Sequence, residues 1–247
     1  MSWWRRRPGL PEDAADLVEA NITHWAHLDD DERGRLLELT EWLLLHKSWE
    51  AANGFALDDT IRTVIGAQAA LLVLGLTPDH YGQVTAIVVH PSTSTQRGER
   101  AGPVAGTATD DVLPIYGLAQ DRRGPVLIAW DQARSAARHP ERGHNVVFHE
   151  FAHKLDMQSG MIDGTPPLDR ADLPEWTRIC TEVYEDLRAG RRRPPLRDYG
   201  AVNTGEFFAV ATEAFFDVPR ELAHHEPDLY RVLQGFYRQD PAARVAP

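Results

Sequence analysis

Residues 145–156 read NVVFHEFAHKLD, an apolar run that contains two histidines four positions apart. The spacing of the apolar residues predicts a helix over this run. Side chains four positions apart lie on the same face of a helix, so His149 and His153 can bind one metal ion. Glu150 lies on the flank of that face, where it can accept a proton from a metal-bound water. The motif therefore predicts a catalytic zinc site on a buried helix.

The composition is that of a globular protein without a basic surface. The chain has 247 residues, of which 43% are hydrophobic, and its formal net charge is -11. A chain of this length can bury a hydrophobic core without disulfides. We expect one domain over residues 1–247, with flexible segments at residues 1–10 and 91–111. The negative charge argues against nucleic acid as a partner, because phosphate binding needs a basic surface.

The chain also lacks the sequence features of an exported or membrane protein. Cys180 is its single cysteine, so no intramolecular disulfide can form. The basic and aromatic N-terminal segment has no apolar stretch of the kind found in signal peptides. No run reaches the roughly 18 apolar residues of a membrane helix. We therefore expect a cytoplasmic protein without stable membrane insertion.

Most of the chain outside the motif shows helical periodicity. Helices are predicted after the acidic residues at 29–31 and 58–59, and over residues 172–187, 204–216 and 228–239. Clusters of β-branched residues predict two strands, one over residues 83–89 and one over residues 125–130. The expected fold is therefore α+β, mainly helical with a small mixed sheet.

A third metal ligand must come from another part of the chain. A catalytic zinc usually has three protein ligands and one open position for water. Glu206 and Glu213 lie seven residues apart in an apolar segment, on roughly one helix face. Both are candidates, and these residues alone do not separate them. Asp156 lies about 10 Å along the helix from His149, so we expect it to hold a ligand imidazole or the helix end.

Longer strings around these residues resemble the Mlc titration factor A family of zinc-dependent peptidases. They are HEFAHKLD at residues 149–156, and Tyr199 followed by EFFAV at residues 206–210. The catalytic domain of anthrax lethal factor carries similar strings. The resemblance covers most of the chain, and it implies a zincin-like metallopeptidase fold.

The resemblance also implies a role for each site residue. It implies one zinc ion held by His149, His153 and Glu206. Glu150 is then the general base, and the phenol of Tyr199 stabilises the oxyanion. Glu213 becomes an acid that lies behind the ligands or faces the core.

Family members are described as aminopeptidases, so the resemblance implies a peptide or protein substrate. The founding member binds the glucose repressor Mlc. An alternative function is therefore a regulatory protein that sequesters a transcriptional repressor, with the zinc site secondary. Peptidases of this kind usually bind substrate along a sheet edge, and residues 126–129 are the candidate edge, with a plain core strand as the alternative. Some members carry a further histidine that caps the metal, but residues 107–120 contain none here.

Overall fold

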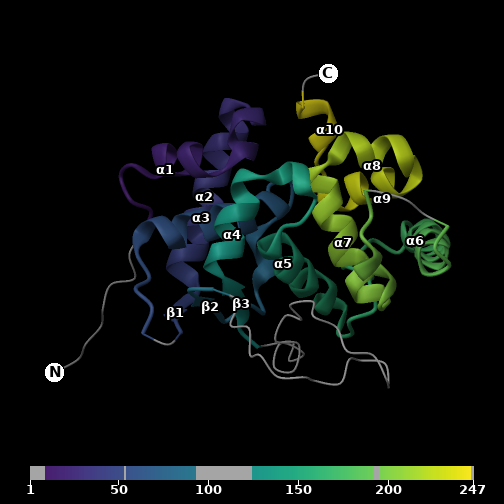
Figure 1. The fold of residues 1–247 in the computed structure, drawn as a ribbon, viewed down its shortest axis with the longest axis horizontal. Helices are drawn as coiled ribbons and strands as arrows, with labels where there is room; N and C mark the ends of the chain where they lie inside the picture. The colour runs from purple at the N-terminus through teal and green to yellow at the C-terminus, as the bar shows by residue number, and fades with distance from the viewer. Residues whose placement is uncertain (1–8, 53, 93–123, 192–194, 246–247) are drawn as a thin grey trace.

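The fold is taken from a computed structural model that describes residues 9–52, 54–92, 124–191 and 195–245 (Figure 1). The expected flexible segments, residues 1–10 and 91–111, fall almost entirely outside these ranges. Within them the structure is mainly helical with one small sheet, which confirms the α+β fold class. No helix among these residues is both long and apolar enough to cross a membrane.

The sheet has three described strands in the order β1-β2-β3. They are β1 (Ser48–Ala51), β2 (Ala86–His90) and β3 (Val126–Ala129), and both neighbouring pairs run parallel. A mixed sheet was expected, but every described strand runs in the same direction. Parallel strands need a long crossover connection, and α3 (Asp59–Leu72) provides one between β1 and β2. The strand predictions near residues 83–89 and 125–130 are confirmed, whereas β1 was not predicted.

The N-terminal helices pack around α3. Before it come α1 (Ala14–Asn21) and α2 (Asp30–His46), and both contact α3. The start of α2 has a full capping box, in which the side chain of Asp29 accepts from the backbone N–H of Glu32. Residues 63–72 of α3 are all buried, so this helix forms the centre of the N-terminal half.

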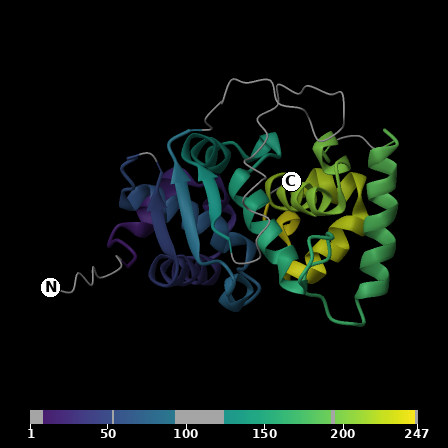
Figure 2. The same ribbon diagram turned by 90° about the horizontal axis from the view of Figure 1, so that it is seen from below.

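The C-terminal half is built from helices alone among the described residues. They are α4 (Trp130–Arg138), α5 (Val146–Asp156), α6 (Leu173–Arg188), α7 (Thr204–Asp217), α8 (Pro219–His225), α9 (Pro227–Tyr237) and α10 (Pro241–Arg244). Figure 2 shows the sheet and first helices on one side, α6 to α10 on the other, and α5 between them.

The contact that positions the functional site is the one between α5 and α7. Both helices are buried on nearly every side, from residue 147 to 156 and from residue 205 to 217. Phe148 packs against Phe216 with ring centroids 5.5 Å apart, and both rings belong to the main core. Close packing along this length fixes the position of α5 relative to α7, so polar side chains on the facing surfaces meet in a defined pattern.

Candidate metal centre

The start of α5 is fixed by a side-chain cap. Asn145 is the N-cap residue, and its side-chain oxygen accepts from the backbone N–H groups of Val147 (3.0 Å) and Phe148 (3.2 Å). The helix that follows presents His149 and His153 on one face, one turn apart. Their Nε2 atoms lie 3.2 Å from each other. The predicted convergence of the two imidazoles is therefore present.

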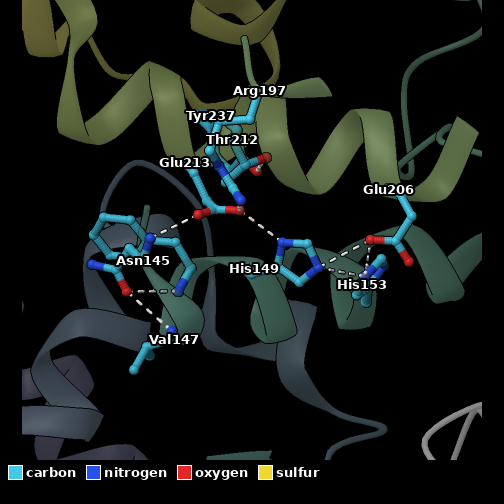
Figure 3. A network of polar contacts seen from close by, with 10 residues as sticks. Asn145, Val147, His149, His153, Arg197, Glu206, Thr212, Glu213 and Tyr237 are labelled. Atoms are coloured by element: carbon cyan, nitrogen blue, oxygen red, sulfur yellow. Dashed lines mark hydrogen bonds and ion pairs between the residues drawn. The ribbon is translucent and has the colours of Figure 1, made fainter. Parts of the chain in front are cut away.

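Glu206 reaches these two histidines from the first turn of α7. The side chain of Asn203 caps this helix by accepting from the backbone N–H of Glu206 at 2.9 Å. The Oε2 atom of Glu206 lies 3.1 Å from Nε2 of His149 and 3.6 Å from Nε2 of His153 (Figure 3). All three side chains are buried, and we call them the ligand cluster. Within the described residues, no other group of three such side chains converges in this way.

The spacing of the ligand cluster fits a metal ion. Ligand atoms about 2.1 Å from a tetrahedrally coordinated zinc ion lie roughly 3.4 Å from one another. The three separations in the cluster, 3.1, 3.2 and 3.6 Å, bracket that value. Two imidazole nitrogens and one carboxylate oxygen are also a donor set that zinc prefers.

Glu213 lies on the opposite side of the His149 ring. Its Oε1 atom accepts from Nδ1 of His149 at 2.7 Å, and its Oε2 atom accepts from the backbone N–H of Asn145 at 2.7 Å. Because an ionised carboxylate only accepts hydrogen bonds, Nδ1 carries the proton. In the neutral imidazole, the lone pair of Nε2 then faces the ligand cluster. The two acids that the sequence left as alternatives thus contact different nitrogens of one imidazole, and only Glu206 lies in the cluster.

The charges of these side chains are strongly coupled. Burial alone would lower the pKa of His149, but hydrogen bonds to Glu206 and Glu213 raise it to about 10. Burial would raise the pKa of Glu206, but hydrogen bonds to the two histidines lower it to about 2. Without a metal ion, His149 is therefore protonated on both nitrogens, and its positive charge compensates the negative charges of Glu206 and Glu213. A metal ion must displace that proton when it binds.

Glu150 and Tyr199 lie next to the ligand cluster. Glu150 is buried on α5, and burial raises the pKa of its carboxyl group, an effect that the neighbouring His149 partly offsets. Tyr199 belongs to the short helix η5 (Asp198–Ala201), and its ring centroid lies 6.0 Å from that of His149. The structure therefore brings both residues to the same place, although they are 49 positions apart in the sequence.

Asp156 holds the segment that follows α5. Its two carboxylate oxygens accept from the backbone N–H groups of Gly164 and Thr165, each at 2.9 Å. Burial raises the pKa of Asp156 to about 6, although both hydrogen bonds act in the other direction. Through these bonds Asp156, the last residue of α5, anchors the loop that follows the helix.

Two residues with a part in this site were not predicted. Asn145 both caps α5 and donates its backbone N–H to Glu213. Its position directly before the apolar run is a typical N-cap signal that could have identified it. The Nη2 atom of Arg197 lies 2.5 Å from Oε1 of Glu213. No local signal distinguishes Arg197 from the other arginines of the 188–197 segment.

A buried cluster of two histidines and a glutamate on packed helices is a donor set that can hold a metal ion. Comparison with known proteins identifies the class of protein. The profile of the glucose-regulated metallo-peptidase M90 family matches residues 1–238, and this chain belongs to that family. The family implies a metal ion at the site and a peptide or protein as substrate.

Relatives of this chain share most of its length. An uncharacterized protein of Synechocystis is 34% identical over 240 residues, which cover 96% of this chain and 86% of the relative. Mlc titration factor A of Serratia proteamaculans is 28% identical over 254 residues, covering 99% and 95% of the two chains. The protein of the same name from Pectobacterium atrosepticum is 29% identical over 239 residues, covering 91% and 89%.

Proposed function

We propose that this protein is a zinc-dependent peptidase of aminopeptidase type, with one zinc ion held by His149, His153 and Glu206. The observation that carries the proposal is the spacing of the ligand cluster, whose three facing atoms lie 3.1 to 3.6 Å apart in a buried site. Membership of a metallopeptidase family supports it. Three protein ligands leave a tetrahedral ion one position for water or substrate.

The residues of this chain supply the remaining chemistry. When bound, zinc lowers the pKa of its water toward about 7 and polarises the substrate carbonyl. Glu150 accepts the proton of the attacking water and passes it to the leaving amine, a role that suits a carboxyl group whose pKa is raised by burial. The phenol of Tyr199 donates a hydrogen bond to the oxyanion that develops on the substrate. Glu213 keeps the His149 imidazole in the tautomer that binds metal.

The substrate is proposed to bind as an added strand along β3. Among the described residues, β3 is an edge strand of the sheet, and it contacts α5. Its residues alternate between buried and half-buried, so Leu127 and Ala129 lie on its more accessible face. Backbone hydrogen bonds along such an edge hold a peptide of almost any sequence.

Glu150→Gln tests the mechanism. The variant keeps the shape of the side chain but cannot accept a proton, so peptide hydrolysis should fall by about 10²- to 10⁴-fold while zinc is retained. Zinc content is measured by mass spectrometry, and turnover with a library of short peptides. The matched control is Glu182→Gln on the exposed face of α6, which should leave both quantities unchanged. Full turnover by Glu150→Gln would refute the mechanism.

A second candidate function is supported by the names of the relatives. Proteins called Mlc titration factor A are 28–29% identical over nearly the whole chain. The alternative is therefore a protein that sequesters a transcriptional repressor, with the metal site secondary. Titration of a purified Mlc repressor bound to its operator DNA separates the two. Stoichiometric release that Glu150→Gln leaves unchanged, together with no hydrolysis of any library peptide, would favour the alternative.

A further inference from the structure

Arg197 is placed at the junction of two parts of the candidate site. The Nη2 atom of its guanidinium lies 2.5 Å from Oε1 of Glu213, the same oxygen that accepts from Nδ1 of His149 (Figure 3). The Glu213 side chain is fully buried, whereas that of Arg197 is 31% exposed. One carboxylate oxygen is thus shared by a metal-ligand histidine on its inner side and by a cation on its outer side.

The backbone of Arg197 leads directly into the turn that carries Tyr199. Arg197 is the N-cap residue of η5, and its carbonyl oxygen accepts from the N–H of Gly200 at 3.0 Å. The carbonyl oxygen of Tyr199 then accepts from the N–H of Val202 at 3.2 Å. The backbone of Arg197 is therefore hydrogen-bonded into the same turn that carries Tyr199.

Apolar packing holds this turn in place, and the side chains of Tyr199 and Ala201 lie against the main core. Gly200 lies so close to α6 and α7 that an added Cβ would be 3.1 Å from Leu187 and 3.4 Å from Val210. These contacts hold η5 against the two helices. The ion pair joins one guanidinium nitrogen of Arg197 to one carboxylate oxygen of Glu213, so it connects the start of η5 to the residue that holds His149.

We propose that Arg197 is a positioning residue that aligns Tyr199 with His149 through the carboxylate of Glu213. Its side chain fixes Glu213, which holds the metal-ligand imidazole, and its backbone fixes the turn that presents the phenol. Misplacing a catalytic group by about 1 Å can cost about 100-fold in rate, so this alignment matters for turnover. The inference rests on the proposed function for the role it gives to Tyr199.

A double-mutant cycle in the zinc-loaded, full-length protein tests the link to Tyr199. Arg197→Met should lower kcat about 10- to 100-fold and change KM less than about threefold, because an aligned phenol acts in the transition state. In the Tyr199→Phe background, Arg197→Met should lower kcat by less than about threefold further, since the group it aligns is gone. Arg197→Lys, which keeps the charge and loses the planar fork, should fall between wild type and Arg197→Met. Fully additive effects, or a raised KM at unchanged kcat, would overturn the proposal.

Two further measurements do not depend on peptidase activity. Arg197→Met should speed hydrogen exchange at the Gly200 and Val202 amides and weaken zinc binding about 3- to 10-fold, because Glu213 loses its outer partner. The matched control is Arg191→Met, which removes an exposed ion pair to Asp186 from the same segment and should change neither quantity. If both variants behave alike, Arg197 is not a positioning residue.

These outcomes remain separable from those of the proposed function. If the wild-type protein hydrolyses no peptide, the proposed function fails, but amide exchange and zinc affinity still decide whether Arg197 organises the site. If the wild type is active and Arg197→Met is as active as Arg191→Met, the proposed function stands and the positioning role is refuted. Should Arg197→Met not fold, Arg197→Lys provides the same comparison.

Discussion

Glu206 and Glu213 stand on the same helix, seven residues and about 10 Å apart, yet they have different surroundings. Glu206, in the first turn of α7, faces the Nε2 atoms of both histidines. Glu213, two turns later, faces Nδ1 of His149, the backbone of Asn145 and the guanidinium of Arg197. The His149 ring lies between the two acids, so one imidazole gives each of them a separate function. The two acids have the same side chain and lie on the same face of α7. They differ only in the groups that lie opposite them.

The last acid of α7 extends the comparison. Asp217 is fully buried, and its Oδ1 atom lies 3.1 Å from Nε2 of His24. Burial raises the pKa of Asp217 to about 6, and the pair with His24 only partly counteracts this effect. Two histidines lower the pKa of Glu206 to about 2 instead. A buried contact between one histidine and one acid is therefore not in itself a metal site. A metal site needs several ligand atoms that converge on one point, as they do at Glu206.

The largest expected effect is the loss of metal on removing Glu206. Glu206→Ala leaves only two protein ligands, too few for a stable catalytic zinc site. The purified variant should lose its zinc on dialysis, whereas Glu213→Gln should retain it. Metal content by mass spectrometry decides the matter. If Glu213→Gln were metal-free and Glu206→Ala fully loaded, the assignment of the two acids would be reversed.

A smaller effect is expected at Glu213. Glu213→Gln keeps an oxygen for the backbone of Asn145 but loses the charge that holds His149, so zinc affinity should fall about 10- to 100-fold. Competition with a coloured chelator measures this change. Glu185→Gln, on the surface of α6, is the control and should bind zinc like the wild type. Unchanged affinity in Glu213→Gln would show that Glu213 serves only the core.

Zinc affinity should also depend on pH. The pKa of His149 is raised to about 10, so this imidazole holds a proton near neutral pH, and zinc must displace it. At lower pH a larger fraction of His149 is protonated, and the proton competes with zinc. Zinc affinity should therefore increase with pH, by up to about tenfold per unit between about pH 6 and 9. Calorimetry in buffers of different ionisation enthalpy should detect release of about one proton. A pH-independent affinity would contradict this account of the cluster.

The smallest effect on zinc binding is expected from Asp217→Asn, which should instead change how the stability of the fold depends on pH. The folded-state pKa of Asp217 is about 6, above its ordinary 3.8, so the folded state holds this proton more tightly than the unfolded state. Stability is therefore lost as the pH rises from about 4 to about 6, by something on the order of 2 to 3 kcal/mol. The variant has no carboxyl group at this position and lacks this loss. The free energy of unfolding of the variant minus that of the wild type should therefore increase over the same pH range. Urea titrations of both proteins without metal measure the difference.

Zinc affinity provides the control for the same variant. Asp217→Asn should bind zinc at pH 7.5 within about twofold of the wild type, since Asp217 is not part of the ligand cluster. A stability difference that did not change with pH would show that the carboxyl group of Asp217 has an ordinary pKa.

Much of the fold could be predicted from local patterns. The helix over residues 145–156 and the strands near residues 86–90 and 126–129 lie where the sequence patterns predicted them. The strand β1 was missed, because Ser48–Ala51 is only four residues long, too short for its alternation of polar and apolar residues to identify a strand. Its extended form depends on pairing with β2, a contact across 38 residues. The parallel direction of β1 and β2 likewise follows from the helical crossover between them and not from the strand sequences.

The site divides in the same way. The pairing of His149 with His153 is a property of local helix geometry, since four residues make about one turn, and it could be read directly from the chain. Resemblance to a family pointed to Glu206 and Tyr199. The separate surroundings of Glu206 and Glu213, and the contact of Arg197 with Glu213, depend on how α5, α7 and η5 pack together. Packing brings together residues that are 16 to 68 positions apart, and no local periodicity encodes such distances.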